Sequence, residues 1–535
     1  MQNTNKLLSI KNLKKYFPIA KSSVFQKEQL YVRANEEISI DIHYGETFGL
    51  VGESGCGKST LGRTILQLYE QTAGSSIYYG RTLAEFAPSY VQKTLRNAPS
   101  MIKAYHKAKA HAEQLQKVCD EAGENATFFQ IQNANLAAAE AETALQNVAK
   151  ILGGFMALGN ECTAGASLLL EKFKLDVKAS EIRTQLFDLE TDVTFYTDLL
   201  KDTKKREKAQ KKLETLKARK QKLNTLLDAT VKEIDGVIAK INTLKASYEG
   251  NEEFAKYEAM LDDGIDLSRL KYSEMRLLRK DIQIIFQDPY SSLNPRMTVG
   301  QIIEEGLVTH KFYKHGSPQM KEHILKVMEQ CGLQDYMLHR YPHQFSGGQR
   351  QRICIARALA VNPKFIVCDE CVSALDVSIQ SQIINLLEEL KEKQNLTYLF
   401  ISHDLSVVRY ISDRIGVMYL GNMVELGDAD TIFKDPRHPY TIALLSSIPT
   451  TDMNALDKER IILEGNIPSP IRPPEGCKFH TRCYMACDKC KRVPPPYVEV
   501  EPGHFVACHF LDKKVDDNGN YLFDVKTATA GEDRK

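Results

Sequence analysis

The sequence has almost no net charge, because 70 Lys and Arg residues are balanced by 69 Asp and Glu residues. A formal charge of +1 gives no global reason to expect nucleic acid or an acidic substrate as a partner. The N-terminal stretch "MQNTNKLLSI" also lacks an apolar core of signal-peptide length. These two absences predict a soluble protein that stays in the cytoplasm.

A clean membrane-spanning run is missing as well. The best candidate is "ILGGFMALGNECTAGASLLL", residues 151–170, which holds Asn160 and Glu161 near its middle. A Glu at the centre of a spanning helix costs about 3 kcal/mol on insertion scales. The run therefore predicts two buried helices joined by a glycine-rich turn.

Proline is absent between Pro99 and Pro289, where Ala, Leu, Lys, Gln and Glu dominate. Alternating steps of three and four residues define a seam in which all members but Lys220 and Thr230 are apolar: Leu213, Leu216, Lys220, Leu223, Leu227, Thr230, Ile234, Val237, Ile241 and Leu244. This spacing predicts a coiled coil. An antiparallel hairpin is its expected form, because both ends must return to one domain.

The run from Lys201 to Lys222 contains eleven basic and three acidic residues. A solvated helix face is the simpler interpretation. Contact with anionic lipid or RNA is the alternative.

A phosphate-binding loop is predicted in "ETFGLVGESGCGKST", residues 46–60. An apolar strand, a glycine-rich loop and a helical run follow one another there, and the loop fits the pattern G-x-x-x-x-G-K-S. Lys58 is expected to reach the β- and γ-phosphates of a nucleotide, and the Ser59 hydroxyl to ligate Mg²⁺. The predicted nucleotide-binding residues are Gly52, Glu53, Ser54, Gly55, Cys56, Gly57, Lys58, Ser59 and Thr60.

Three further strands end in polar side chains that suit phosphate chemistry. "KFIVCDE" ends at Asp369, a candidate Mg²⁺ ligand, and Glu370, a candidate general base for an attacking water. "TYLFISHD" leads to His403, and "IQIIFQDP" leads to Gln287, whose amide can touch both Mg²⁺ and water. Ligands gather at such strand ends in open α/β sheets.

With these motifs in family order, the chain resembles the nucleotide-binding subunits of ABC transporters. The resemblance covers about residues 7–80 and 267–449 and assigns the remaining motifs. "FSGGQ" (345–349) matches the signature, with Phe345 in place of the usual Leu, and "SALD" (373–376) matches the D-loop with Asp376. Phe17, or else Tyr16, is the implied aromatic that stacks on adenine.

The resemblance implies that two such domains pair head to tail. The signature residues Ser346, Gly347, Gly348 and Gln349 would then hold the nucleotide bound by the partner's Walker A loop. Catalysis would fall to Glu370, with Gln287 and His403 beside it, and the cofactors would be ATP and Mg²⁺ held by Ser59, Gln287 and Asp369.

The stretches "RKDIQIIFQDPYSSLNPRMTVGQII" and "GCKFHTRC" are similar to the ATP-binding subunits of oligopeptide/dipeptide (and nickel) permeases, nearest the F-type subunit. This similarity implies peptide import at the cytoplasmic face of the cell membrane. The implied partners are a second homologous ATPase in a heterodimer, two transmembrane permeases and an extracellular peptide-binding lipoprotein. No nucleic acid is expected.

A non-transport ABC ATPase of the chromosome or DNA-repair type is the rival interpretation, because those proteins also carry long coiled coils. Their helices enter after the Q-loop glutamine, whereas Gln287 follows the insertion here. They also lack the "GCKFHTRC" tail.

Lys58 and Gln287 are 229 positions apart, much farther than in the family, so an insertion is predicted between them. The expected fold is an α/β P-loop (RecA-like) ABC domain with a helical subdomain, interrupted by an all-α coiled coil. The predicted segments are 1–80 and 267–450 for the ATPase domain, 81–266 for the insertion and 451–535 for a cysteine-containing extension. The final "TATAGEDRK" is expected to be disordered.

Five cysteines lie between Cys477 and Cys508. The four that match the family tail are Cys477, Cys483, Cys490 and Cys508. Such a set suits a [4Fe–4S] cluster, while Cys487 and Cys490 also permit a zinc site. Reduced structural cysteines are the third alternative.

Overall fold

A computed structural model describes residues 5–21, 28–200, 206–448 and 461–510, so the predicted disorder of "TATAGEDRK" lies outside the described residues. The chain forms two compact units. The first unit comprises Met1–Ser76 and Tyr272–Lys535, and the second comprises Ile77–Lys271. Each unit has its own hydrophobic core.

The first unit is built on an eight-stranded sheet of order β11-β12-β10-β9-β3-β8-β7-β6. Strands β9, β3, β8, β7 and β6 run parallel, and β10, β12 and β11 continue the sheet antiparallel. The strands are β3 Thr47–Val51, β6 Ile282–Ile285, β7 Phe365–Asp369, β8 Thr397–Ile401, β9 Arg414–Tyr419, β10 Asn422–Asp428, β11 Tyr497–Glu501 and β12 His504–Ala507.

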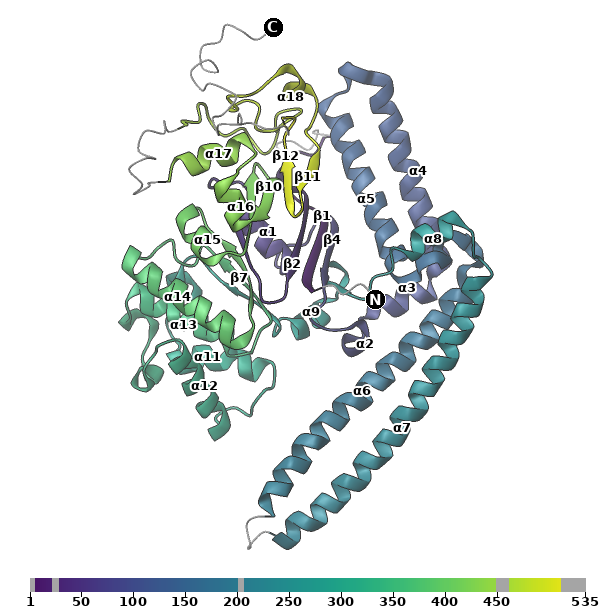
Figure 1. The fold of residues 1–535 in the computed structure, drawn as a ribbon, viewed down its shortest axis with the longest axis vertical. Helices are drawn as coiled ribbons and strands as arrows, with labels where there is room; N and C mark the ends of the chain where they lie inside the picture. The colour runs from purple at the N-terminus through teal and green to yellow at the C-terminus, as the bar shows by residue number, and fades with distance from the viewer. Residues whose placement is uncertain (1–4, 22–27, 201–205, 449–460, 511–535) are drawn as a thin grey trace. The chain divides into compact units, whose positions relative to one another are not determined.

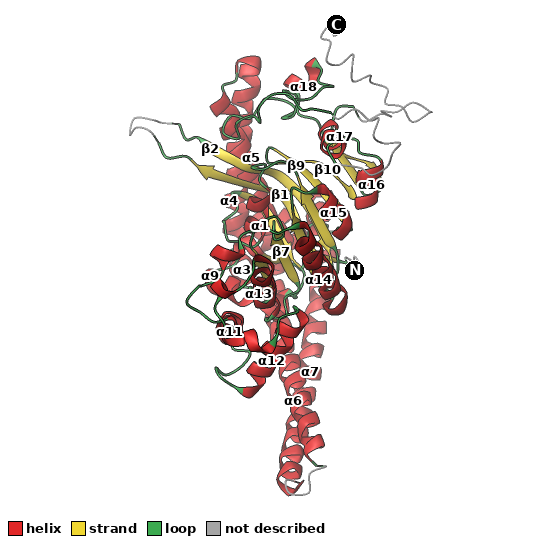
Figure 2. Ribbon diagram, turned by 90° about the vertical axis from the view of Figure 1, so that its left-hand side faces the viewer, coloured by secondary structure: helices red, strands yellow, loops and turns green. Residues whose placement is uncertain are grey.

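The central strands β3, β7 and β8 are buried along their whole length. Parallel strands covered on both faces read as continuous apolar runs, which is why "TFGLV", "FIVCD" and "TYLFI" carry so few charges. Figure 2 shows the strands with helices packed around them. The helices of this unit are α1 Lys58–Ile65, α9 Tyr272–Leu278, α10 Pro289–Ser292, α11 Val299–Thr309, α12 Pro318–Gln330, α13 Gly347–Leu359, α14 Val377–Gln394, α15 Leu405–Ile411, α16 Ala429–Lys434, α17 Pro439–Ser446 and α18 Asp488–Arg492.

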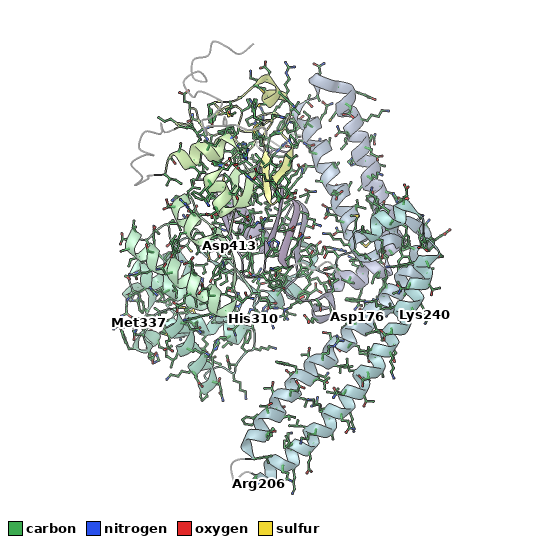
Figure 3. The ribbon with its side chains drawn as sticks, in the orientation of Figure 1. Asp176, Arg206, Lys240, His310, Met337 and Asp413 are labelled. Atoms are coloured by element: carbon green, nitrogen blue, oxygen red, sulfur yellow. The ribbon has the colours of Figure 1, made fainter. Side chains whose placement is uncertain are left out.

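A helical part lies in the chain between β6 and β7. Helices α11, α12 and α13 pack on one another through buried side chains such as Ile303, Val327 and Ile355. Short 3₁₀ turns, Asp335–His339 and Pro342–Gln344, connect α12 to α13. His310 and Met337 mark this part in Figure 3.

A second, smaller sheet has the order β2-β1-β4-β5. The long strands β1 Lys6–Pro18 and β2 Tyr31–His43 pair antiparallel. Strand β4 spans Ala73–Tyr78, and its last two residues pair antiparallel with β5, Ile265–Asp266. The chain therefore passes from the first unit to the second within β4, and β5 lies shortly before the chain returns to the first unit at Tyr272.

The second unit is helical apart from this strand pair. Helices α4 and α5 lie side by side, and so do α6 and α7 (Figure 1). The elements are α2 Leu83–Phe86, α3 Ser89–Arg96, α4 Ala98–Ala122, α5 Phe128–Leu152, α6 Thr163–Leu199, α7 Arg206–Ala246 and α8 Glu252–Glu258, with 3₁₀ turns Gly123–Asn125, Gly153–Cys162 and Leu267–Arg269.

The long helices α6 and α7 pack against each other along a mainly apolar seam. On α7 every residue of the seam predicted from the sequence is buried or half-buried, while the positions between them are mostly exposed. On α6 the facing side chains include Ile182 and Leu189. In Figure 3, Asp176 and Lys240 lie near one end of this helix pair and Arg206 lies near the other.

Residues 151–170 form a helix end, a 3₁₀ turn and a new helix, as the glycine-rich turn predicted. Glycine is needed at position 165, because a Cβ there would come within 2.4 Å of the Phe155 ring. Within the described ranges, no helix is both long and apolar enough to cross a membrane.

Candidate functional site

The loop after β3 has the shape that its glycines allow. Gly52, Gly55 and Gly57 all have positive φ, of 148°, 80° and 103°. A Cβ at Gly57 would lie 2.1 Å from the Ala34 carbonyl oxygen, and one at Gly52 would lie 2.2 Å from that of Met418. A side chain at either position would therefore force the loop open.

The loop leads into α1 without a side chain capping the helix. Gly57 stands at the N-cap position and makes no side-chain hydrogen bond, so the first N–H groups of α1 are available to an anion. Ser59 and Thr60 are half-buried in its first turn, while Ser54 and Gly55 are exposed on the loop.

Lys58 is buried and folds back on the loop. Its Nζ donates to the carbonyl oxygens of Gly52 at 2.7 Å and of Glu53 at 3.0 Å. The neighbouring Cys56 is also buried, and burial raises the pKa of its thiol although Lys58 opposes this shift. The Cys56 thiol is therefore neutral, and the Lys58 ammonium is the positively charged group of the loop.

Three candidate catalytic residues meet at the carboxyl ends of adjacent strands. Gln287 follows β6, Glu370 follows β7 and His403 follows β8. The Gln287 Nε2 donates to Glu370 Oε2 at 2.9 Å, and His403 Nδ1 lies 3.5 Å from the same oxygen. The structure thus brings together residues that the sequence places 83 and 33 positions apart.

Exposure distinguishes the members of this cluster. The Glu370 side chain is only 14% exposed, whereas that of His403 is 56% exposed. The backbone N–H of Glu370 donates to Ile401 of β8, which ties the carboxylate to the sheet. A carboxylate held next to an open side of the site suits a general base.

Asp369, the last residue of β7, is almost completely buried. Its Oδ2 accepts from Arg63 Nη2 of α1 at 3.1 Å, and its Oδ1 is buried without a hydrogen-bond partner among the described residues. Mg²⁺ prefers oxygen ligands and keeps several of its waters. A buried, unsatisfied carboxylate oxygen together with the Ser59 hydroxyl and the Gln287 amide fits this ion.

The role of Arg63 was not predicted from the sequence. It lies five residues beyond Lys58 in α1, and nothing in the mixed polar and apolar stretch "KSTLGRTI" indicates a partner on β7.

The adenine-stacking alternatives differ in the structure. Tyr16 is buried, and its hydroxyl donates to the Glu36 carboxylate at 2.5 Å. Phe17 is half-buried, with Tyr69 against its edge and the Lys15 ammonium 4.5 Å from its ring centre. Of the two rings, Phe17 is the one that keeps accessible surface.

The signature begins helix α13. Ser346 is the N-cap, its Oγ accepts from the Gln349 N–H at 3.4 Å, and the Gln349 side chain accepts from the Ser346 N–H at 3.1 Å. Gly348 packs under α14, where a Cβ would meet Ile379 at 2.5 Å. Ser346 and Gly347 are exposed, so this end of α13 is open to a partner.

The D-loop ends at Asp376, which precedes α14 and is exposed. The next residue, Val377, is 78% exposed. An exposed apolar side chain beside a polar motif is typical of a contact surface. The exposure of Val377 was not predicted from the sequence.

The tail cysteines are all free thiols. Burial raises the pKa of Cys477 to about 11 and of Cys483 to about 12, and the neighbouring thiols Cys490 and Cys508 add to both shifts. Among the described residues, however, no three His, Cys, Asp or Glu side chains are placed closely enough to hold a metal ion, so the geometry does not support the predicted cluster or zinc site.

The same tail reaches the phosphate-binding loop. Arg482 donates to both carboxylate oxygens of Glu53, at 2.7 and 3.0 Å. The Tyr440 hydroxyl accepts from the Glu53 N–H at 2.9 Å. Neither contact was predicted from the sequence, in which Cys483 was the only candidate functional residue of "HTRC".

Comparison with known proteins agrees with this geometry. The family described as ABC transporter matches residues 35–231 and 243–373, and the family described as oligopeptide/dipeptide transporter, C-terminal region, matches residues 424–490. The oligopeptide transport ATP-binding protein AppF of Bacillus subtilis is 55% identical over 252 residues, which cover 47% of this chain and 76% of AppF. The oligopeptide transport ATP-binding protein OppF of Haemophilus influenzae is 49% identical over 246 residues, covering 46% and 74%.

These matches confirm the resemblance to the ABC nucleotide-binding fold and leave the chromosome and DNA-repair alternative without support. None of these family descriptions or relatives' names mentions a coiled coil or a metal cluster, so those two predictions gain no support from the comparisons. The chain belongs to the ABC transporter family, as an ATP-hydrolysing subunit that carries an oligopeptide/dipeptide transporter C-terminal region.

Proposed function

We propose that this subunit powers the import of oligopeptides across the cell membrane. The observation that carries the proposal is the 55% identity to a protein named for oligopeptide transport, together with the match of residues 424–490 to the transporter C-terminal region. The solute itself would be selected by other subunits, so the class of peptide does not follow from this chain.

In the proposed reaction, the exposed N–H groups of the loop and of α1 bind the phosphates. Lys58 exchanges its contacts with the Gly52 and Glu53 carbonyls for the β- and γ-phosphates of ATP. Glu370 accepts a proton from the attacking water, while Gln287 and His403 hold the Oε2 atom of Glu370 in position. His403 also faces the γ-phosphate from the open side.

We assign Ser59, Gln287 and Asp369 as the residues that would hold Mg²⁺. When bound, the ion would neutralise charge on the phosphate oxygens. The ion pair between Arg63 and Asp369 keeps that carboxylate oriented.

We propose that the functional ATPase is a head-to-tail pair, formed with a second homologous subunit. The open end of α13 at Ser346 and Gly347 would bind the γ-phosphate held by the partner's Walker A loop, with Gly348 and Gln349 completing the motif. The exposed Asp376 and Val377 support a contact at the same face of the subunit.

The further partners would be two transmembrane permeases and an extracellular peptide-binding lipoprotein. This subunit would then work at the cytoplasmic face of the membrane. ATP binding would close the pair and hydrolysis would open it, and that movement would be passed to the permeases.

We propose that residues 81–266 are an insertion into an ATPase domain made of 1–80 and 267–450, with 451–535 as its extension. The compact unit Ile77–Lys271 supports an insertion of this size. The burial of the seam from Leu213 to Leu244 supports an antiparallel coiled coil.

The four tail cysteines are proposed as ligands of a metal, with a [4Fe–4S] cluster ahead of zinc. Their clustering in the sequence between Cys477 and Cys508 supports this proposal. Because no three ligand side chains converge among the described residues, no step of the reaction is assigned to a cluster. Protein purified without oxygen should contain about four irons and four sulfides per chain. Stoichiometric zinc without iron would replace the cluster with a zinc site, and the lack of both would leave the cysteines structural.

Transport is tested by reconstituting this subunit in vesicles with the proposed permeases and second ATPase. We expect ATP hydrolysis to rise when the peptide-loaded binding protein is added, and radiolabelled peptide to accumulate only with ATP. Hydrolysis stimulated by DNA, with no response to the binding protein, would contradict the import function.

A further inference from the structure

The C-terminal extension touches the nucleotide site directly, through Arg482. Its guanidinium forms a two-pronged ion pair with Glu53, the second residue of the phosphate-binding loop. The two residues are 429 positions apart. The Arg482 side chain is only 6% exposed, and its hydrogen bonds to Glu53 hold its pKa above the ordinary value.

Glu53 is held from three directions. Arg482 binds its carboxylate, the Tyr440 hydroxyl accepts from its backbone N–H, and its backbone carbonyl accepts from Lys58. Bidentate Arg–carboxylate pairs fix orientation as well as distance. The position of Glu53 in turn decides where the Lys58 ammonium and the loop N–H groups lie.

The groups that hold Glu53 are themselves rigidly packed. The rings of Tyr419, Tyr440 and Phe479 pack edge to face with centroids 4.9 to 5.3 Å apart. Phe479 is almost fully buried and accepts at its carbonyl from the Arg482 N–H at 3.0 Å. Arg482 is therefore held in place by its contacts with the core of the first unit.

We propose that Arg482 is a positioning residue for ATP binding, which shapes the phosphate-binding loop by holding Glu53. The extension is then a working part of the nucleotide site. It does not touch the phosphates, and it acts only through the loop.

The test is a titration of ATP against the full chain, without permeases or a partner ATPase. Arg482→Ala should weaken ATP binding about tenfold, the scale of one lost charge-assisted hydrogen-bonded pair. Glu53→Gln should weaken binding to a similar degree. Since Arg482 acts through Glu53, the double variant should be no weaker than either single variant.

Two further variants separate positioning from general damage. Arg482→Lys keeps the charge but loses the fork, so its affinity should lie between those of the wild type and Arg482→Ala. Glu501→Gln removes another ion pair of the extension, with Arg437 at 2.9 Å, and should leave ATP affinity unchanged. In the assembled complex, Arg482→Ala should raise KM for ATP while kcat at saturating ATP changes by less than about twofold.

Melting curves identify variants that fold, and only those are compared. If Arg482→Ala fails to fold, Arg482→Lys and Glu53→Gln still decide the question. ATP affinity within about twofold of the wild type in folded Arg482→Ala would overturn the proposal, or in folded Glu53→Gln if Arg482→Ala does not fold. Effects of the two substitutions that multiply in the double variant would also overturn it. Because ATP binding is measured on the chain alone, a failure of peptide import would not affect this result.

Discussion

At the scale of single residues, Glu370 has an unusual backbone. Its φ is 48°, in the left-handed region that costs a residue with a side chain about 1–3 kcal/mol. This conformation turns the carboxylate from the end of β7 towards Gln287 and His403. The strained backbone conformation of Glu370 therefore orients the carboxylate of the proposed general base.

Glu370→Gln should retain ATP binding and lose at least about a hundredfold in hydrolysis, the usual scale for a lost general base. Phosphate release at saturating ATP measures the rate, and nucleotide titration measures the binding. Glu392→Gln, an exposed carboxamide substitution on α14, is the control and should hydrolyse normally. A near wild-type rate for Glu370→Gln would show that another group is the base.

Glu36 gives the first unit an acid-sensitive contact. Burial favours its neutral form, but Lys478 and Lys14, with the Tyr16 hydroxyl, outweigh burial and hold the pKa of Glu36 below its ordinary value. A lowered folded-state pKa means that the folded protein binds fewer protons than the unfolded chain in acid. The stabilisation is thus complete above about pH 5 and is lost as the pH falls through the folded-state pKa.

Glu36→Gln should lower the free energy of unfolding by about 3 kcal/mol at neutral pH, because the buried Lys14 ammonium loses its buried partner and the Lys478 ammonium loses a nearby negative charge. The difference from the wild type should shrink between about pH 5 and pH 3. Urea unfolding at several pH values measures it. Glu37→Gln, which alters the exposed partner of Lys14, is the matched control and should have a small effect. A pH-independent difference would exclude the linkage.

At the scale of elements, the helix pair α6 and α7 combines an apolar seam with complementary charge. The last part of α6 carries Asp188, Glu190 and Asp192, and α7 opposite is rich in Lys and Arg. Lys220 pairs with Glu190 across the two helices at 2.6 Å. Part of the basic run is therefore balanced inside the hairpin, which favours the solvated-face interpretation for the described residues of that run.

Leu216→Ala should destabilise the second unit by about 2–4 kcal/mol, because it leaves a cavity in the seam. Leu226→Ala removes a side chain of the same helix that is 43% exposed and should cost less than about 1 kcal/mol. Hydrogen exchange of the helix amides compares the two. Equal effects would mean that the seam does not hold the helices together.

At the scale of the whole molecule, ATP hydrolysis is expected to need two subunits. Ser346→Arg should abolish hydrolysis at the partner's nucleotide through bulk and charge at the open end of α13. ATP affinity of the isolated chain should stay close to that of the wild type, with a melting temperature lowered only by the lost helix cap. Gln319→Arg on α12 controls for added charge. Full hydrolysis by an isolated monomer would contradict the shared site.

The second unit should be removable. Joining Gly80 directly to Leu267 would delete Ile265 and Asp266, which pair with Tyr78 and Ile77. A Gly/Ser linker from Gly80 to Gly264 keeps this strand pair and should give a folded protein whose melting temperature rises with ATP. Thermal melting with and without ATP measures it. Aggregation, or melting that ATP does not shift, would show that the insertion is part of the ATPase core.

Local patterns accounted for much of the fold. The strand, loop and helix around Lys58 and the seam of α7 follow from spacing along a few turns or strands, because side-chain direction repeats locally. Contacts between residues on different strands of the sheet were harder to predict from the sequence. The sequence placed Gln287, Glu370 and His403 at strand ends, but their contacts with one another could not be predicted from it, and it left Phe17 and Tyr16 as alternatives.

Short stretches of sequence were enough to predict the phosphate-binding loop, the resemblance to ABC nucleotide-binding subunits and the long helices between residues 81 and 266, because each prediction rests on short motifs or on a locally repeating pattern. The order of the strands in the folded sheet makes β6, β7 and β8 neighbours, and this brings two distant polar side chains, Gln287 and His403, to one carboxylate oxygen of Glu370. Only the tertiary structure decided that Tyr16 is occupied by Glu36 and that Arg482 holds Glu53. Such contacts depend on strand order and on the packing of the extension, and no short stretch of sequence encodes either.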